Sequence, residues 1–390
     1  MISSLRRLKQ FWIWHFHTLR VFLARQIKKT QMLLGYSGSI VEVRLKDELY
    51  TAKKVAVVAI FPTKDDFYAK SLKHLLAGMF ENQICICAMV NGCVSTEIGE
   101  ILEEFNCSVF QRKNKGRDFG AYQDGITWLK KNELLQNVDR LFLANDTLMW
   151  FEDSSGVVAQ SMMEDWHCLF FNLEDHSHAQ SFFLSFSGKI LKNREFKKFW
   201  KKYAAVKYRK AAIVNGEMAL STVLLKNGFI CSTLVDPAWI EQKLQTLDLT
   251  PDLRQLLGVM HVKGNPPEVS VPGTKRTTLT VKEQIEEYRI EETEFSRIDN
   301  SMYLFHLRMM LSQNATSHAP HRIGLYLYLL FGLPMKADLY KTSSLGDIAR
   351  VVSFRNPEML RCANDFYMSK SQRYMLGTRR VKMQKRRSEL

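Results

Sequence analysis

The chain has 390 residues, 46% of them hydrophobic, so it can bury a full core and form one large domain or two of ordinary size, and general disorder is excluded. Its seven cysteines show neither CxxC nor zinc-like Cys/His spacing, and we expect reduced thiols in a cytoplasmic protein. The net charge of +15 comes almost wholly from the ends, since residues 1–30 carry seven Lys and Arg without an acid and residues 370–390 carry eight against Glu389. The body is nearly neutral, which argues against a nucleic-acid groove across it.

The first predicted element is an amphipathic helix within residues 1–35. Its apolar stripe repeats at spacings of three and four and consists of Leu5, Leu8, Trp12, Phe16, Leu19, Leu23 and Ile27. The longest stretch without Lys or Arg, FWIWHFHTL, is too short to span a bilayer, which takes about 20 apolar residues. We expect a helix that lies on an anionic membrane surface. The alternative is a helix packed on its own domain or in a dimer.

Short apolar runs alternate with helical patterns from residue 55 to residue 146. The strand-like runs are VAVVAIF (55–61), ICICAMVNG (84–92), CSVFQRKN (107–114) and RLFLAND (140–146). This alternation predicts βαβ units, a mainly parallel sheet and the α/β class. Polar residues follow three of the runs: Asn91, the segment NKGRD, and Asn145 with Asp146. Because ligands bind at the carboxyl ends of such strands, we expect these residues to meet at one crevice.

The segment NKGRDFGAY (114–122) stands between the third run and the next helical pattern. Gly116 and Gly120 permit close backbone approach, the helix start can face an anion, and Lys115 and Arg117 add cationic donors, so a diphosphate fits. The pattern is neither a Walker P-loop nor a dinucleotide GxGxxG motif. An ordinary glycine-containing turn is the alternative.

NKGRDFGAY resembles the N-x-GRD-x-x-x-[YF] signature of the rhamnan synthesis protein F family, bacterial glycosyltransferases of cell-surface polysaccharide assembly. Further stretches resemble that family in the same order, from about residue 55 to 340: RLFLANDT, HAQSFFLSFSGKILKNREFKKFW, NGEMALSTVLLKNGF and HRIGLYLYLLFGLPMKADLY. The same segments resemble, more weakly, the GT-A class of inverting glycosyltransferases. The resemblance implies a GT-A-like, Rossmann-type nucleotide-sugar-binding domain with a mainly parallel sheet.

The resemblance also implies a role for each matched residue. Glu217 is expected to be the catalytic base, with Asp165 as the alternative base; NGEM could instead be only a helix start in which Glu217 follows the N-cap. The expected donor contacts are Asn91, Asn114, Lys115, Gly116, Arg117, Asp118, Tyr122, Asn145 and Asp146. Asn91 is included because it follows a predicted strand. The residues expected near the acceptor or the donor sugar are His178, Gln180 and Ser181.

Asn145 and Asp146 occupy the place of the GT-A metal motif, but they offer one carboxylate where that motif usually offers two. One alternative is Mg²⁺ or Mn²⁺ held by Asp146, the donor diphosphate and water. In the other, Lys115 and Arg117 supply the positive charge.

These inferences predict four parts: a membrane-associating helix (1–35), a glycosyltransferase domain (50–250), a loop and helical part on the acceptor side (251–355) and a basic tail (370–390). The expected reaction moves rhamnose or another deoxyhexose from a dTDP-rhamnose-like donor to a lipid-linked polysaccharide or lipopolysaccharide acceptor at the inner face of the cell membrane. Two rivals are a catalytically silent carbohydrate- or lipid-binding protein of the same fold and a basic nucleic-acid binder.

Overall fold

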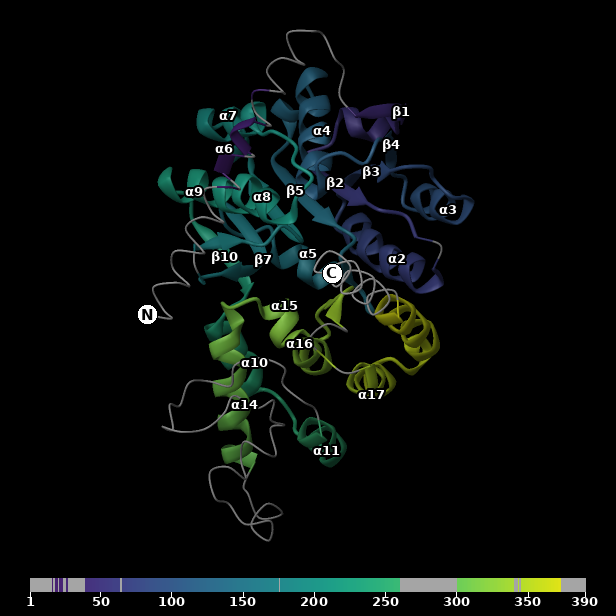
Figure 1. The fold of residues 1–390 in the computed structure, drawn as a ribbon, viewed down its shortest axis with the longest axis vertical. Coiled ribbons are helices and arrows are strands. Elements are labelled where there is room, and N and C mark those ends of the chain that lie inside the picture. The colour runs from purple at the N-terminus through teal and green to yellow at the C-terminus, as the bar shows by residue number, and fades with distance from the viewer. Residues whose placement is uncertain are drawn as a thin grey trace, which may run out of the picture. The chain divides into compact units, whose positions relative to one another are not determined.

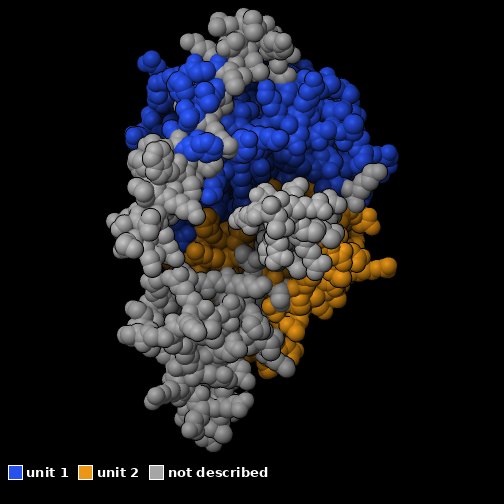
Figure 2. Space-filling view, viewed as in Figure 1, with its two compact units in different colours: residues 1–63, 73–146, 153–234 blue, residues 64–72, 147–152, 235–390 orange. Residues whose placement is uncertain are grey.

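The computed structural model describes residues 39–63, 65–174, 176–259, 300–339, 343 and 345–372, and within the N-terminal segment residues 16, 18, 19, 21–23 and 26 (Figure 1). Most of the predicted N-terminal helix, residues 260–299 of the predicted acceptor-side loop and helical part (251–355), and the tail from residue 373 lie outside these residues. The chain divides into two compact units, coloured separately in Figure 2. Unit 1 comprises residues 1–63, 73–146 and 153–234, and unit 2 comprises residues 64–72, 147–152 and 235–390.

A parallel sheet lies at the centre of unit 1 (Figure 1). Its strands are β2 (Lys54–Ile60), β3 (Cys85–Asn91), β4 (Ser108–Arg112) and β5 (Arg140–Asn145). They lie in the order β4-β3-β2-β5, with parallel pairing throughout. Nearly every residue of β2, β3 and β5 is buried, as expected for parallel strands covered on both faces. The predicted α/β class and mainly parallel sheet are confirmed.

Further strands, most of them paired antiparallel, extend the sheet on both sides. At one edge β1 (Ile40–Arg44) pairs with β4, and beyond β5 the order continues through β9 (Phe183–Ser187), β7 (Trp166–Asn172) and β10 (Cys231–Val235). The short β8 (His178–Ala179) pairs with β7. The strand order changes direction at β2, between β3 and β5. This is the switch point at which ligands bind in sheets of this kind.

The helices of unit 1 connect these strands. They are α2 (Asp66–Glu81, whose first turns belong to unit 2), α3 (Thr96–Glu104), α4 (Arg117–Lys131), α5 (Ser155–Gln160), α6 (Gly188–Lys192), α7 (Arg194–Lys202), α8 (Arg209–Ile213) and α9 (Ala219–Lys226), with 3-10 turns at Asp47–Tyr50 and Leu135–Asn137. Helix α4 packs on β2 and β3. It can lie close because a Cβ at Gly125 would come within 2.6 Å of a Val57 methyl. Helices α2, α3 and α4 confirm the helical patterns predicted after the first three strand-like runs.

Unit 2 is mostly helical. Its helices are α10 (Pro237–Gln245), α11 (Pro251–Val259), α14 (Asn300–Ala315), α15 (Ala319–Arg322), α16 (Gly324–Phe331) and α17 (Leu345–Arg355), followed by a 3-10 turn (Pro357–Met359) and a helical stretch at 360–372. A small antiparallel pair joins β6 (Leu148–Met149) to β11 (Met335–Lys336). No helix among the described residues combines the length and the apolar character needed to cross a membrane.

Candidate functional site

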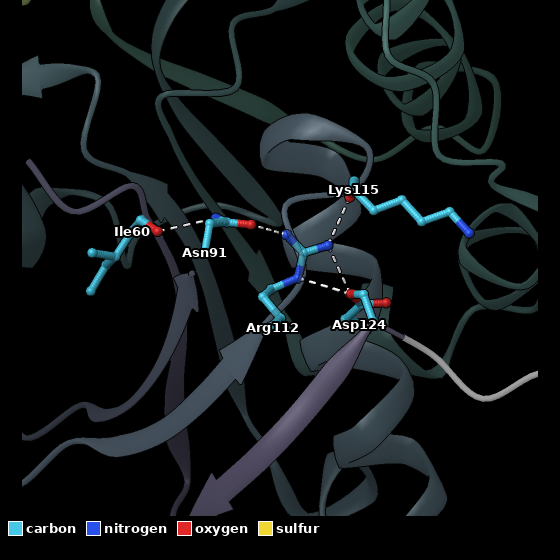
Figure 3. A network of polar contacts seen from close by, with 6 residues as sticks. Ile60, Asn91, Arg112, Lys115 and Asp124 are labelled. Atoms are coloured by element: carbon cyan, nitrogen blue, oxygen red, sulfur yellow. Dashed lines mark hydrogen bonds and ion pairs between the residues drawn. The ribbon is translucent and has the colours of Figure 1, made fainter. Parts of the chain in front are cut away.

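A buried arginine organises the carboxyl ends of the parallel strands (Figure 3). Arg112, at the end of β4, is 1% exposed. Its guanidinium donates to the carboxylate of Asp124 (2.9 Å from Nε) and to the carbonyl of Lys115 (2.7 Å), and its Nη1 donates to Oδ1 of Asn91. The amide of Asn91 in turn donates to the carbonyl of Ile60 (3.0 Å). One side chain thus links β2, β3, β4, the loop before α4 and α4 itself.

The two glycines of NKGRDFGAY allow the chain to fold tightly into α4. Gly116 has φ +82°, and a Cβ there would lie 2.4 Å from Cβ of Ala205. A Cβ at Gly120 would lie 2.1 Å from the carbonyl oxygen of Lys115. Arg117 also has a left-handed φ of 57°, a costly conformation for a residue other than glycine. The close approaches that the glycines permit are therefore to the protein's own backbone and to Ala205.

The exposed part of the same loop carries cations. Asn114, Lys115 and Arg117 are exposed, and Gly116 between them is buried. The side chain of Lys115 points away from Arg112, although its carbonyl accepts from it (Figure 3). The motif therefore combines a fixed backbone with exposed cationic side chains.

Asn145, at the end of β5, connects α4 to the turn after β8. Its Nδ2 lies 3.2 Å from Oδ2 of Asp118, 3.1 Å from the hydroxyl of Tyr122 and 3.1 Å from the carbonyl of Ser181. Tyr122 donates to that same carbonyl at 2.8 Å. Burial raises the pKa of Tyr122 well above its usual value, and the charge of Asp118 adds to the rise, so Tyr122 stays protonated and can donate.

Glu217 reaches the same cluster from a π-helical turn. This turn, Val214–Met218, joins α8 to α9 without a break, so NGEM does not start a helix and the alternative interpretation of Glu217 does not hold. A Cβ at Gly216 would lie 2.7 Å from the ring of Phe119, so only glycine lets the turn pack this closely against α4. Single π turns inside helices are frequent at functional sites.

Ser181 and His178 surround the carboxylate of Glu217. Ser181 donates to Oε1 from its backbone N–H (3.1 Å) and its hydroxyl (2.6 Å). Nε2 of His178 lies 3.6 Å from Oε2. The carbonyl of His176 accepts from Nδ1 of His178 at 2.5 Å, which fixes the imidazole ring. The Glu217 side chain is 13% exposed.

Tyr203 also belongs to this site. Burial raises the pKa of its hydroxyl; the charges of Asp118 and Glu217 add to the rise, and Arg117 opposes it. These influences place all three charged residues near the same phenol. Its ring lies 5.6 Å from that of Phe119 in the motif helix. Sequence reasoning missed Tyr203 and Arg112, because neither lies at a position marked by a motif.

Two predicted residues lie in the same region with different partners. Asp146 is 8% exposed, its N–H donates to the carbonyl of Ala59 (3.3 Å), and its carboxylate accepts from the N–H of Phe61. It therefore lies where β2 ends, at the switch point. Gln180 is 6% exposed, and in the part of the chain that the structure describes its Oε1 has no hydrogen-bond partner. A buried amide oxygen without a partner is rare, and it suits a ligand hydroxyl.

Asp165, the alternative base, lies apart from this cluster. Its carbonyl accepts from Ser187, which pairs with Arg140 at the opposite end of β5 from Asn145. Its carboxylate accepts from the N–H of Ile230 (3.0 Å) and from Lys189 (3.0 Å). Burial alone would raise the pKa of Asp165, but these two donors outweigh it and lower the pKa. Asp165 is thus a carboxylate with structural partners.

Among residues 39–63, 65–174, 176–259 and the described part of unit 2, no group of three or more His, Cys, Asp and Glu side chains is placed to hold a metal ion. The carboxylate of Asp146, the predicted metal ligand, already accepts a hydrogen bond from Phe61.

The comparisons with known proteins match this region of the chain. Residues 86–260 match the model of the family described as rhamnan synthesis protein F. This confirms the resemblance seen in NKGRDFGAY, and the matched range contains every predicted site residue, from Asn91 to Glu217. The segment HRIGLYLYLLFGLPMKADLY lies beyond it. An uncharacterized protein of Sinorhizobium fredii, y4gN, is 28% identical over 156 residues, which are 38% of this chain and 40% of that relative.

Solved structures give weaker likenesses. The glycosyltransferase GlyE of Streptococcus pneumoniae TIGR4 is 12% identical over 48% of this chain and 46% of its own, with a TM-score of 0.30. The galactosyltransferase LgtC in complex with donor and acceptor sugar analogs is 12% identical over 46% of this chain and 74% of its own, with a TM-score of 0.29. Such scores are too low to support an argument, and the α/β class rests on this chain's own strand order.

Proposed function

Because residues 86–260 match the rhamnan synthesis protein F family, we propose that the protein is a glycosyltransferase that moves a sugar from a nucleoside diphosphate to a glycan acceptor. One observation carries the proposal. Asp118, Asn145, Ser181 and Glu217 come from four separate segments and form one hydrogen-bonded cluster beside the carboxyl ends of the parallel strands. A sheet of this order binds nucleotides at that edge.

In the proposed reaction the oxygen of the acceptor hydroxyl attacks the anomeric carbon of the donor sugar, and Glu217 accepts the hydroxyl proton. The bond from that carbon to the diphosphate oxygen breaks, and its electron pair leaves with the diphosphate. A single displacement of this kind inverts the anomeric configuration. Because Ser181 holds Oε1 with two hydrogen bonds, Oε2 is the oxygen that takes the proton.

The departing diphosphate needs positive charge near it. We propose that Lys115 and Arg117, with Asn114 and the first N–H groups of α4, supply its ligands. Mg²⁺ or Mn²⁺ on Asp146 is the weaker alternative, since Asp146 is the single carboxylate of its motif and already accepts from Phe61. Removal of divalent ions with EDTA is therefore expected to leave transfer within about twofold.

The other predicted residues fit around the donor sugar. We propose that Asp118 and the buried Oε1 of Gln180 accept hydrogen bonds from its hydroxyls. His178 and Ser181 orient Glu217. Asn91, whose amide joins Ile60 to Arg112, supports the loop instead of contacting the donor. Gly116 is buried against Ala205 and likewise shapes the loop.

The proposed substrates follow from the family resemblance. The donor is a dTDP-rhamnose-like sugar nucleotide carrying rhamnose or another deoxyhexose. The acceptor is a lipid-linked cell-surface polysaccharide or lipopolysaccharide, reached at the inner face of the cell membrane with the help of the N-terminal segment.

The proposal is tested by following release of nucleoside diphosphate from a panel of sugar nucleotides, with and without EDTA and acceptor glycan. Glu217→Gln is expected to slow transfer at least about a hundredfold, with donor affinity nearly unchanged, because Gln keeps the Ser181 hydrogen bonds but takes no proton. Glu100→Gln, on the exposed side of α3, is the matched control. If no donor binds, or if Glu217→Gln transfers as the wild type does, the mechanism is wrong. Donor binding without turnover would instead indicate the catalytically silent carbohydrate-binding protein.

A further inference from the structure

The positive charge of the body is segregated onto one short region. Residues 189–210 contain ten Lys and Arg residues and one acid, Glu195, although the body as a whole is nearly neutral. All ten cations are exposed: Lys189, Lys192, Arg194, Lys197, Lys198, Lys201, Lys202, Lys207, Arg209 and Lys210. The large apolar residues of α7 are buried in the core. This region, α6 to α8, is called the basic face below.

Acids pair with at least two cations of the basic face. Lys198 pairs with Glu195 at 2.9 Å, and Lys189 pairs with Asp165 at 3.0 Å. Between residues 187 and 230 the only other acid is Glu217, which belongs to the candidate site. A surface with so many cations and so few acids attracts an anionic partner over distances comparable to the Debye length.

Val21 of the N-terminal segment packs against this region. Val21 is 5% exposed and packs with Val206, which precedes α8, and with Ala211 and Ala212 within α8. The apolar residues of the predicted stripe that the structure describes, Phe16, Leu19 and Leu23, remain 50–53% exposed, and Phe22 is 54% exposed. Of the described residues here, Val21, which is not in the stripe, is buried, whereas Phe16, Leu19 and Leu23 of the stripe are exposed.

We propose that the basic face and the exposed side chains of Phe16, Leu19, Phe22 and Leu23 form one docking surface for an anionic lipid bilayer. The cations match the charge of the headgroups, and each strengthens binding about fivefold. The exposed Phe and Leu side chains suit the acyl boundary beneath the headgroups, which a nucleic acid does not offer. Neither feature alone specifies a bilayer, but their contact through Val21 places them on the same part of unit 1.

The docking surface is continuous with the candidate base. Helix α8 runs through the π turn to Glu217, and Lys210 and Glu217 are separated by seven residues, roughly 10 Å of helix. This inference rests on the proposed function: docking brings Glu217 to acceptors whose lipid is embedded in the bilayer. The basic face then helps to select such acceptors, together with the N-terminal helix.

The test is flotation of the full-length protein with vesicles of phosphatidylcholine alone and of phosphatidylcholine with one quarter phosphatidylglycerol. Replacing Lys197, Lys201 and Lys202 together by Gln is expected to weaken binding to anionic vesicles roughly a hundredfold. The matched control replaces three exposed lysines elsewhere on unit 1, Lys53, Lys130 and Lys131, by Gln and is expected to change it less than threefold.

A second variant tests the apolar component. Phe16, Leu19 and Leu23 replaced by Ser are expected to abolish stable binding, while Ser at the exposed Met163 and Leu173 leaves it intact. Unchanged anionic-vesicle binding in the triple Gln variant, equal wild-type binding to neutral vesicles, or tighter binding to a single-stranded RNA than to anionic vesicles at equal salt would overturn the proposal.

The donor-binding assay separates this inference from the proposed enzyme. Without vesicles, all four variants are expected to bind the sugar nucleotide as the wild type does, since none alters the candidate site. Donor binding with no preference for anionic vesicles refutes only the docking surface. Vesicle binding without donor binding leaves the surface standing and refutes only the glycosyltransferase.

Discussion

At the scale of single residues, backbone contacts of NKGRDFGAY decide the shape of the candidate site. Gly116 lies so close to Ala205, and Gly120 so close to the Lys115 carbonyl, that neither position has room for a Cβ. The glycines were predicted to permit a close approach, and they do, but to neighbours within unit 1. The contact between Gly116 and Ala205 could not be predicted from the sequence, because Ala205 lies far along the chain.

Gly120→Ala therefore tests the loop. Its Cβ would lie 2.1 Å from the carbonyl oxygen of Lys115, so the loop has to move, at a cost of about 1–3 kcal/mol of unfolding free energy. Donor affinity is expected to fall at least tenfold, measured by titration calorimetry. Gly156→Ala is the control, since a Cβ at Gly156 meets nothing within 4 Å. Equal donor affinities for the two variants would contradict the shape of the loop.

Arg112 allows a second prediction at this scale. Arg112→Met removes the guanidinium but leaves the partly buried Asp124 carboxylate without it, which is expected to cost about 3–5 kcal/mol of stability in urea unfolding. Arg112→Lys keeps a charge but lacks the fork that reaches Asn91, Lys115 and Asp124 together. It is expected to weaken donor binding at least tenfold with a smaller loss of stability. Arg44→Lys, on the exposed edge strand, is the control; a loss of stability without any loss of donor affinity would make Arg112 purely structural.

At the scale of elements, the parallel strands β2 to β5 followed from the sequence, and the strands that flank them did not. Runs such as VAVVAIF are apolar at nearly every position because both faces are covered, so they stand out from the helices between them. Strands β7 to β10 lack such regular spacing. The π turn also could not be predicted, because it depends on Gly216 meeting the ring of Phe119 from another helix.

Strand β7 yields a prediction on pH. Burial, aided by Arg140, lowers the pKa of His167 from 6.5 to about 4. The unfolded state then binds the proton more tightly, so the neutral ring contributes stability above pH 6.5 that is lost as the pH falls toward 4, about 3 kcal/mol in all. His167→Gln is expected to be less sensitive to acid over this range in urea unfolding. His176→Gln, an exposed position, should keep the wild-type dependence, and an unchanged slope in His167→Gln would show that His167 is not its source.

At the scale of the whole molecule, net charge alone is a poor guide to surface chemistry. The count of charges correctly placed most of the excess positive charge at the ends. Residues 189–210 nevertheless carry ten cations, which acids elsewhere in the body offset in the net charge. Only the fold reveals that these cations are all exposed and that Val21 packs on the same region. The candidate site is similar: its residues were predicted singly, whereas their hydrogen bonds required the structure.

If the basic face delivers the site to a bilayer, ionic strength should affect only one of two reactions. Salt screens exposed charges, with a Debye length of about 10 Å at 0.1 M and about 3 Å at 1 M. Transfer to a lipid-linked acceptor in anionic vesicles is expected to fall more than tenfold between these concentrations, because the enzyme leaves the surface. Transfer to a short water-soluble acceptor is expected to change less than twofold, since the polar cluster around Glu217 is mostly buried and less screened. Rates that fall equally for both acceptors would place the salt effect in donor binding by Lys115 and Arg117, and the basic face would have no part in acceptor selection.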